Sequence, residues 1–289
     1  MTRHLKLVLE YDGTAYHGWQ VQPGLDTIQG CLEAALSQLA GTPIQIMGAG
    51  RTDAGVHALG QVASCGVDLR LDDLALQRAL NALLPKDIVV CAVESVPAAF
   101  DARRSARSKT YRYTLLRRAY PSALEGRYTL HVPHAVDMDA MAEAARCLVG
   151  THDFSAFRAG TCAAATPIRT VRRAAWRAEG DLWRFEIEGN AFLQHMVRII
   201  VGTLLDVGRG KRRPNDLPEI LASRDRRRAG KTAPPHGLCL VAVEYCDRRQ
   251  GRSRGRARPR PAGRPACQHQ GLMLHRAERQ PEDVDATRL

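Results

Sequence analysis

A glycine-rich segment, GAGRTDAGVHA at 48–58, places two opposite charges, Arg51 and Asp53, two residues apart. Its glycines permit close backbone approach and positive φ angles, so the chain can fold tightly around both charges. A carboxylate that meets a guanidinium stays ionised, and an ionised aspartate could serve as a nucleophile or a base. The spacing is equally compatible with a tight turn in which Asp53 bonds its own backbone and Arg51 lies on the surface.

The sequence argues against several other enzyme classes. No Gly-Lys-Ser/Thr follows the glycines, as a Walker phosphate loop requires, and Asp53 stands where a dinucleotide-binding fingerprint needs glycine. The zinc peptidase motif H-E-x-x-H is absent. The eight cysteines form no C-x-x-C pair, and several lie in apolar stretches, which is typical of reduced thiols. These patterns predict no metal site and no nucleotide cofactor.

The elements expected around this segment mix helices and strands. Alternating leucines at 5, 7 and 9 predict a first strand, and Thr27 opens a helical pattern that Gly41 ends. Asp72 and Asp137 are candidate N-caps of helices at 72–84 and 137–148. The other predicted strands are 44–47, 61–67, 88–93, 110–116, 168–177, 182–188 and 238–245, and the other predicted helices are 193–207 and 215–222.

The order of these elements favours an α+β fold, because both halves combine helices with hairpin-like strand pairs. We expect an α/β lobe at 1–105 that carries the segment 48–58, and a second α/β lobe at 106–246. The stretch 247–289 alternates arginine with glycine, serine and proline, and its composition predicts a disordered tail. No signal peptide and no run of 18 apolar residues is present, so we expect a cytoplasmic protein without a membrane anchor.

The charge of the chain favours an anionic partner such as nucleic acid, since the net charge is +12 at pH 7. The excess is unevenly distributed. Residues 247–289 hold 11 arginines and 5 acidic residues, a net charge of +6, and the two lobes carry the other half. Charge alone is therefore weak support for nucleic-acid binding by the lobes.

The segment GRTDAGVHA at 50–58 resembles the signature of the tRNA pseudouridine synthase A family. Further segments resemble that family in the same order, from about residue 3 to residue 246: EYDGTAYHGWQ at 10–20, TIQGCLEAAL at 27–36, AFDARRSA at 99–106, KTYRY at 109–113, GNAFLQHMVRIIVGTLLDVGRGK at 189–211 and HGLCLVAVEY at 236–245. The family often has a basic residue after the first glutamine that follows GW, whereas this chain has Val21 there. One RNA contact of the family is therefore expected to be missing.

The resemblance implies an isomerase that converts uridine to pseudouridine at positions 38, 39 and 40 of the tRNA anticodon stem-loop. The bond from uracil nitrogen 1 to the ribose breaks, the base rotates, and carbon 5 is joined instead. Asp53 corresponds to the catalytic nucleophile, and attack on the sugar, attack on the base and assisted expulsion of uracil stay open. The reaction needs no redox or phosphate chemistry, so no cofactor is expected.

The resemblance also assigns roles to three residues near Asp53. Arg51 would pair with Asp53 and fill the gap left by the displaced base. Tyr111 would stack on the target base, and Leu238 would form an apolar wall of the same pocket. Without the resemblance, Tyr111 and Leu238 would be read as core residues.

Several basic residues are candidate RNA contacts. Arg103 and Lys109 belong to a basic run near the junction of the lobes, and Arg198 begins an apolar helix, where each could bind phosphate. A solvated surface is the alternative for each of them. His195 is expected to be a packed or capped residue, and His57 to be structural.

The fold that the resemblance implies is two ferredoxin-like lobes whose strands join into one mixed or antiparallel sheet, with the active-site cleft between them. It also implies a homodimer that grips tRNA. A competing hypothesis is an RNA-binding protein in which the segment 48–58 is only structural. A nucleotide-dependent enzyme is disfavoured by the failed phosphate-loop spacing.

Overall fold

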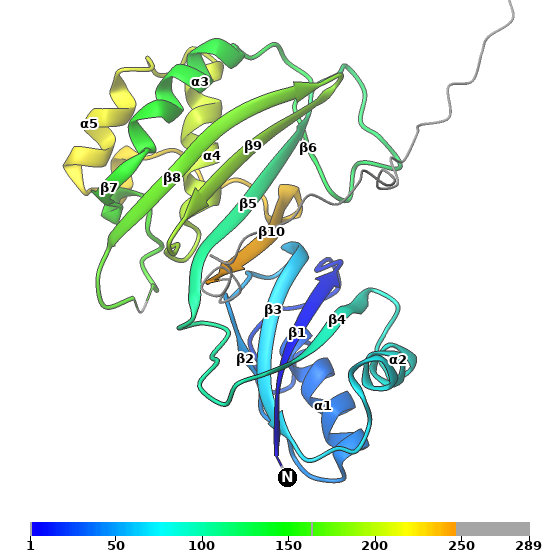
Figure 1. The fold of residues 1–289 in the computed structure, drawn as a ribbon. Coiled ribbons are helices and arrows are strands. Elements are labelled where there is room, and N and C mark those ends of the chain that lie inside the picture. The colour runs from blue at the N-terminus through cyan, green and yellow to red at the C-terminus, as the bar shows by residue number, and fades with distance from the viewer. Residues whose placement is uncertain (1, 163, 247–289) are drawn as a thin grey trace, which may run out of the picture. The chain divides into compact units, whose positions relative to one another are not determined.

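A computed structural model describes residues 2–162 and 164–246, which form a ten-stranded sheet and five α-helices (Figure 1). The predicted tail at 247–289 lies outside the described residues. Within the described part, no helix is both long and apolar enough to cross a membrane.

The N-terminal half has the element order β-α-β-β-α-β. Its elements are β1 (Arg3–Tyr11), α1 (Ile28–Ala40), β2 (Met47–Gly48), β3 (His57–Val67), α2 (Asp73–Leu83) and β4 (Ile88–Val96). The strands lie in the order β4-β1-β3, with β2 also paired to β3, and all these pairs are antiparallel. This is the ferredoxin-like arrangement, in which the first and last strands are neighbours.

The C-terminal half repeats this arrangement with additions. Its main elements are β5 (Ala106–Leu116), α3 (Met138–Ala145), β8 (Ile168–Glu179), β9 (Leu182–Gly189), α4 (Met196–Gly208) and β10 (Leu238–Tyr245). The added elements are β6 (Leu130–His131), β7 (Gly150–Asp153), α5 (Asp216–Ser223) and four short 3₁₀ helices: η1 (Arg146–Leu148), η2 (Ser155–Phe157), η3 (Arg226–Arg228) and η4 (Pro235–Gly237). The strand order β10-β5-β9-β8 matches that of the first half.

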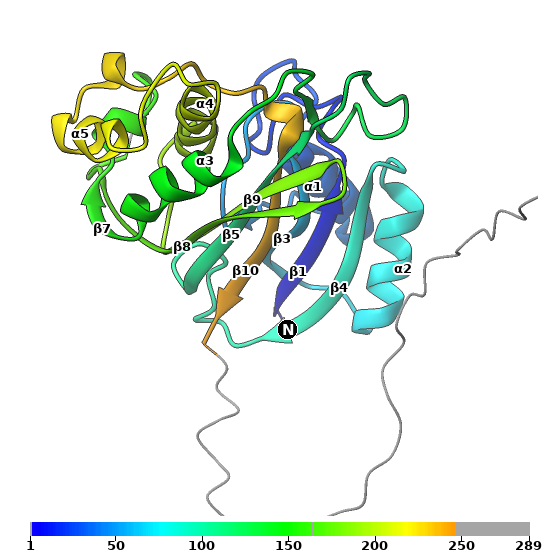
Figure 2. The ribbon, with the colours of Figure 1, turned by 90° about the horizontal axis from the view of Figure 1, so that it is seen from above.

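Strand β10 joins the two halves into one sheet, as Figure 2 shows. It pairs antiparallel with β5 along most of its length and parallel with β3 at two positions, Cys239 with His57 and Leu240 with Ala58. The prediction of an α+β fold with two ferredoxin-like parts and a joined, mainly antiparallel sheet is confirmed. The residue at which one lobe ends and the other begins, 105, stays a prediction.

Local sequence signals account for most element boundaries. Thr27, Asp72 and Asp137 each cap a helix, because each side chain accepts a hydrogen bond from a backbone N–H in the first turn. Gly41 ends α1 with a positive φ of 66°. The strands predicted at 61–67 and 110–116 begin earlier, at His57 and Ala106. Two other predicted elements begin later than expected: the strand predicted at 44–47 begins only at Met47, and the helix predicted from 193 begins at Met196. The second error has a local cause, since His195 adopts the left-handed conformation, which cannot continue a helix.

Candidate active site

A cavity of about 840 Å³ lies where the two halves meet. Its walls come from the β2–β3 loop at 49–56, from β5, from the segment that enters α4, and from the first residue of β10. Six of the seven predicted site residues line it: Arg51, Asp53, Arg103, Lys109, Tyr111 and Leu238. The cavity has the size of a small-molecule or single-nucleotide site.

The β2–β3 loop is held by hydrogen bonds to Gly50 and Thr52, the residues that lead into Asp53. Trp19 donates its backbone N–H to the carbonyl oxygen of Thr52 at 3.0 Å, and the hydroxyls of Tyr11 and Thr52 lie 2.8 Å apart in the core. The Gln61 side chain donates to the carbonyl oxygen of Gly50 at 2.8 Å. The loop is therefore built against β1 and β3 rather than free in solvent, and Asp53 is presented from a fixed backbone.

The motif at 10–20 lies directly against this loop, and its glycines make that approach feasible. Gly18 has a φ of +89°, and a Cβ atom there would lie 2.6 Å from the carbonyl oxygen of Thr52. A Cβ atom at Gly13 would overlap the carbonyl oxygen of Val56. Glycine is required at both positions because any side chain would push the loop away.

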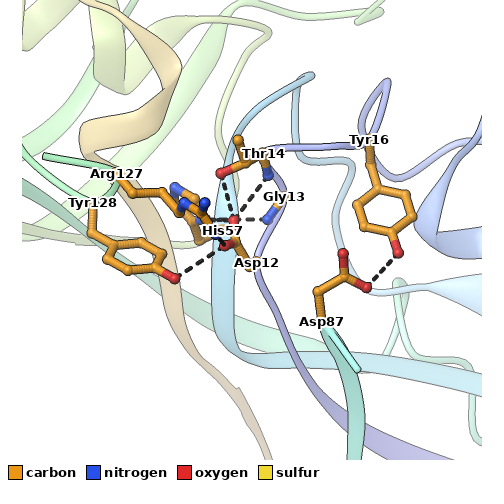
Figure 3. Close-up of polar contacts among 8 residues, drawn as sticks. All are labelled: Asp12, Gly13, Thr14, Tyr16, His57, Asp87, Arg127 and Tyr128. Carbon is orange, nitrogen blue, oxygen red and sulfur yellow. Dashed lines mark hydrogen bonds and ion pairs between the residues drawn. The ribbon is translucent and has the colours of Figure 1, made fainter. Parts of the chain in front are cut away.

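The end of the loop is fixed by a polar cluster around Asp12, drawn in Figure 3. His57, the first residue of β3, is buried, and its Nδ1 accepts from the backbone N–H of Gly13 at 3.1 Å and lies 3.0 Å from Asp12 Oδ1. Burial lowers the pKa of His57 despite the neighbouring carboxylate of Asp12. A buried, neutral His57 that does not line the cavity fits the structural role expected of it.

Asp12 also connects the two halves of the molecule. Its Oδ2 accepts a hydrogen bond from Tyr128 at 3.0 Å and lies 3.3 Å from Arg127 Nη1, both in the segment between β5 and β6 (Figure 3). Burial alone would raise the pKa of Asp12, but hydrogen bonds from Thr14 and Tyr128 outweigh it and lower this pKa to about 2. Asp12 is thus a charged residue outside the cavity that links the two halves through Arg127 and Tyr128.

Asp53 is paired across the cavity with a residue of the other half. Its Oδ2 accepts a hydrogen bond from Arg198 Nη1 at 2.9 Å and lies 3.6 Å from His195 Nε2. The Asp53 side chain is 22% exposed. Among the described residues, no hydrogen bond reaches its other oxygen, Oδ1, so that oxygen is available to a substrate.

The expected pairing of Arg51 with Asp53 is wrong. No ion pair joins these two residues in the described structure, because Thr52 between them is turned into the core and the Arg51 side chain is exposed at the cavity. Arg198 takes its place. Its Nε donates to the carbonyl oxygen of Ala233 at 2.8 Å, which leaves Nη1 directed at Asp53, and its side chain is only 13% exposed.

His195 was expected to be a packed or capped residue, and its position differs from that expectation. It occupies the N-cap position of α4 with a φ of 60°, but its side chain makes no capping hydrogen bond and lines the cavity beside Asp53. Phe192 and Arg169, which the sequence did not single out, line the same cavity. Phe192 belongs to the family-like segment at 189–211, whereas no local pattern marked Arg169.

Tyr111 and Leu238 form an apolar wall near Asp53. Tyr111 lies on β5 and is 7% exposed, and its ring meets Phe192 edge to face at 5.1 Å between ring centroids. Burial, with added repulsion from Tyr11 and Asp53, raises the pKa of Tyr111 and keeps its hydroxyl protonated. Leu238 is 5% exposed and opens β10 directly opposite Tyr113. Flat and apolar side chains therefore line the cavity close to the carboxylate.

Comparison with known proteins identifies the family. A family model described as tRNA pseudouridine synthase matches residues 7–103 and 144–246. A protein of Acetivibrio thermocellus named tRNA pseudouridine synthase A is 47% identical over 243 residues, covering 84% of this chain and 100% of that protein. Its namesake in Geotalea uraniireducens is 46% identical with the same coverage, and that of Myxococcus xanthus is 48% identical over 84% of this chain and 92% of its own. The chain belongs to the tRNA pseudouridine synthase A family.

Membership of this isomerase family agrees with the charge of the cavity. Arg51, Arg103, Lys109 and Arg169 all line it, whereas Asp53 is its one acidic lining residue among those described. Burial, with repulsion from Arg103 and Arg169, lowers the pKa of Lys109 to about 8. Burial and the neighbouring Arg51 likewise lower the pKa of Arg103. Arg51 and Arg103 are exposed and Lys109 and Arg169 half-buried, so the cavity carries a net positive charge that is accessible from solvent.

The same cavity offers little to a metal ion. Within residues 2–162 and 164–246, no group of three or more His, Cys, Asp or Glu side chains could hold one.

Proposed function

We propose that this protein isomerises uridine to pseudouridine at positions 38, 39 and 40 of the tRNA anticodon stem-loop, without a cofactor. The observation that carries the proposal is Asp53: one carboxylate oxygen is held by Arg198, and the other is open at the wall of a nucleotide-sized cavity. The bond between uracil nitrogen 1 and ribose carbon 1′ breaks, and a bond from uracil carbon 5 to carbon 1′ forms. The proton on carbon 5 is lost to solvent and nitrogen 1 gains one.

Asp53 is proposed as the nucleophile of this reaction. Arg198 supports that role because its guanidinium, buried and held by Ala233, stabilises the ionised carboxylate and orients it. His195 lies 3.6 Å from the same oxygen and adds a second polar group on that side. The carboxylate can reach the sugar or the base of a bound uridine, so attack on either, or assisted expulsion of uracil, is compatible with the geometry.

Tyr111 and Leu238 are proposed to hold the target base. A uridine must leave the helix to enter the cavity, at a free-energy cost of a few kcal/mol. Stacking on an aromatic side chain offsets part of this cost, by roughly 1–3 kcal/mol per base. Tyr111 is suited to this role because its buried ring is fixed by Phe192 and by the strand pairs on either side of β5.

The cations of the cavity are proposed to bind the phosphates around the target uridine. Arg103 and Lys109 keep this expected role, and Arg169 joins them. Arg198 does not, since its guanidinium is occupied by Asp53 and Ala233. Arg51, exposed at the cavity, is proposed to fill the gap that the displaced base leaves in the stem.

We further propose that the protein acts as a homodimer in the cytoplasm, where unmodified tRNA is present. This proposal rests on the family resemblance. Sedimentation equilibrium of the purified protein measures the oligomeric state, and a monomer at micromolar concentration would contradict the dimer.

The competing proposal is an RNA-binding protein in which the pair of Asp53 and Arg198 only braces the cavity. The deciding experiment uses an unmodified tRNA transcript tritiated at uridine carbon 5, which releases tritium to water when pseudouridine forms. Wild-type protein is expected to release tritium with no added cofactor, and Asp53→Asn to lose at least about 10³-fold in rate, since the nucleophile is gone.

Asp181→Asn is the matched control, because Asp181 is exposed in the turn between β8 and β9. It should react at the wild-type rate. Binding of several tRNAs by the wild type without tritium release would leave the RNA-binding alternative in place of the isomerase.

A further inference from the structure

A second hollow adjoins the cavity of the candidate active site. It is a shallow groove of about 510 Å³ formed by the segment around η2 and the segment around η3. Gly160 lines this groove and the next residue, Thr161, lines the cavity. The Cα atoms of consecutive residues lie about 3.8 Å apart, so the segment at 160–161 borders both the groove and the cavity.

Four arginines line this arginine groove: Arg158, Arg224, Arg226 and Arg227. Two of them have carboxylate partners. Arg224 lies 3.2 Å from Asp153, and Arg227 lies 2.9 Å from Asp225. In each pair, the carboxylate offsets the charge of its arginine.

The other two arginines form no ion pair with a described carboxylate. Arg226 donates only to neutral oxygens, at 3.4 Å to the carbonyl of Ala229 and at 3.2 Å to the hydroxyl of Thr232, and burial lowers its pKa. Arg158 has no hydrogen bond or ion pair from its guanidinium to any described residue, and Asp153 is the acidic group that feels its charge. Four arginines stand against only two carboxylates, Asp153 and Asp225, so the groove keeps a net positive charge, and a concave surface of that charge suits an anion.

We infer that the arginine groove binds the phosphate backbone of the tRNA whose target uridine occupies the cavity. The inference rests on the proposed function, because the cavity accepts only about one nucleotide and the rest of the polynucleotide must leave across its rim. The rim at 158–161 leads directly into the groove, and arginine is the side chain best suited to grip phosphodiesters in two-point contacts. An acidic protein is the alternative occupant.

Substitution of Arg158 provides the test, because this side chain has no internal partner whose loss could unfold the protein. Binding of an unmodified tRNA transcript by full-length protein is measured at increasing KCl. With Arg158→Gln, the slope of log affinity against log salt should become shallower by about 1, as expected for one lost phosphate contact. The KM for tRNA should rise roughly threefold to tenfold with kcat unchanged, and Arg158→Lys should restore the slope.

Arg78→Gln is the matched control. This substitution removes the same charge as Arg158→Gln, but Arg78 is exposed on α2 in the other half. Its slope should equal that of the wild type. Equal slopes for Arg158→Gln and Arg78→Gln would overturn the arginine groove as an RNA site, whether the wild type turns over or not. Absence of tritium release by the wild type would overturn the proposed function instead, so the two failures are distinguishable.

Discussion

The two halves of the molecule share one βαββαβ frame, and one connection within that frame differs sharply between them. In the N-terminal half, the loop between β2 and β3 spans eight residues, 49–56, and carries Asp53. In the C-terminal half, the corresponding connection between β8 and β9 is the two-residue turn Gly180–Asp181. The same βαββαβ frame thus presents the cavity-lining carboxylate of Asp53 in one half and a two-residue hairpin turn in the other.

The comparison shows that neither half contains a complete site. The N-terminal half supplies the carboxylate, and the C-terminal half supplies its cation, Arg198, and the apolar wall of Tyr111 and Leu238. Among the described residues, the strands of the two halves pair with each other only through β10, which is joined to β3 at two positions. The contacts between the halves are therefore where substitutions should have their largest effects.

The largest expected effect in this comparison follows from breaking the ion pair between the halves. Arg198→Met leaves Asp53 without its cation and without a fixed orientation, and kcat should fall about 10²–10³-fold. Arg198→Lys should recover only part of this loss, because lysine cannot donate to Ala233 and Asp53 in the same planar geometry. Single-turnover tritium release measures both, and wild-type kcat in Arg198→Met would mean that the pair serves stability alone.

A second link between the halves runs through Asp12, and its loss should lower stability. The pKa of Asp12 is about 2 in the folded protein and 3.8 in the ordinary reference, so the folded state favours the charged form. This contribution, about 2 kcal/mol, is complete above pH 4–5 and is lost as the pH falls through 2. Asp12→Asn should therefore lower the free energy of unfolding by about that amount at pH 7.

Urea denaturation measures this effect at several pH values. The difference between wild type and Asp12→Asn should shrink from pH 5 to pH 2. A difference that stays constant over that range would contradict the assignment of the stabilisation to the charge of Asp12.

A smaller effect is expected at Lys109, which lies on β5 and lines the cavity from the C-terminal half. Lys109 has a pKa of about 8 because of its burial and the neighbouring charges of Arg103 and Arg169. As the pH rises above 8 the amine loses its proton and its attraction for phosphate, so the KM for tRNA should rise by up to about tenfold with little change in kcat. Lys109→Arg should abolish this pH dependence, and an unchanged KM profile in that variant would exclude Lys109 as its source.

The smallest effect concerns the turn that replaces the reactive loop. Gly180 has a φ of +59° with no atom within 4 Å of a Cβ placed there. Gly180→Ala should cost about 1 kcal/mol of stability through backbone strain, and Gly180→Asn less, since asparagine tolerates this conformation. Thermal denaturation measures the cost. Tritium release should not change, and a loss of turnover would mean that this hairpin does more than close the sheet.

Much of the fold was predictable from local residues. Thr27, Asp72 and Asp137 marked three helix starts, and the alternating leucines of β1 are all buried. The repeat of the βαββαβ frame was not visible in the sequence, because strand order depends on pairings between distant segments. The short strands β6 and β7 were missed for the same reason, since so few residues carry no pattern of their own.

The sequence predicted which residues lie at the candidate site, but not which of them contact one another. Asp53, Tyr111, Leu238, Arg103 and Lys109 all lie at the cavity, and their roles stay predictions until activity is measured. His195 was misjudged because its left-handed backbone, which turns the side chain toward Asp53, leaves no trace in residue type.

The sequence by itself determined the reactive loop, the helix caps and the alternation of the strands, because these depend on hydrogen bonds and side-chain periodicity within a few residues. It also placed the chain in its family through motifs in a fixed order. Only the tertiary structure decided the partner of Asp53, which is not the nearby Arg51 but Arg198, 145 residues away. That choice depends on how β10 joins the two halves and on how Ala233 holds the guanidinium, and neither is encoded in any local stretch of chain.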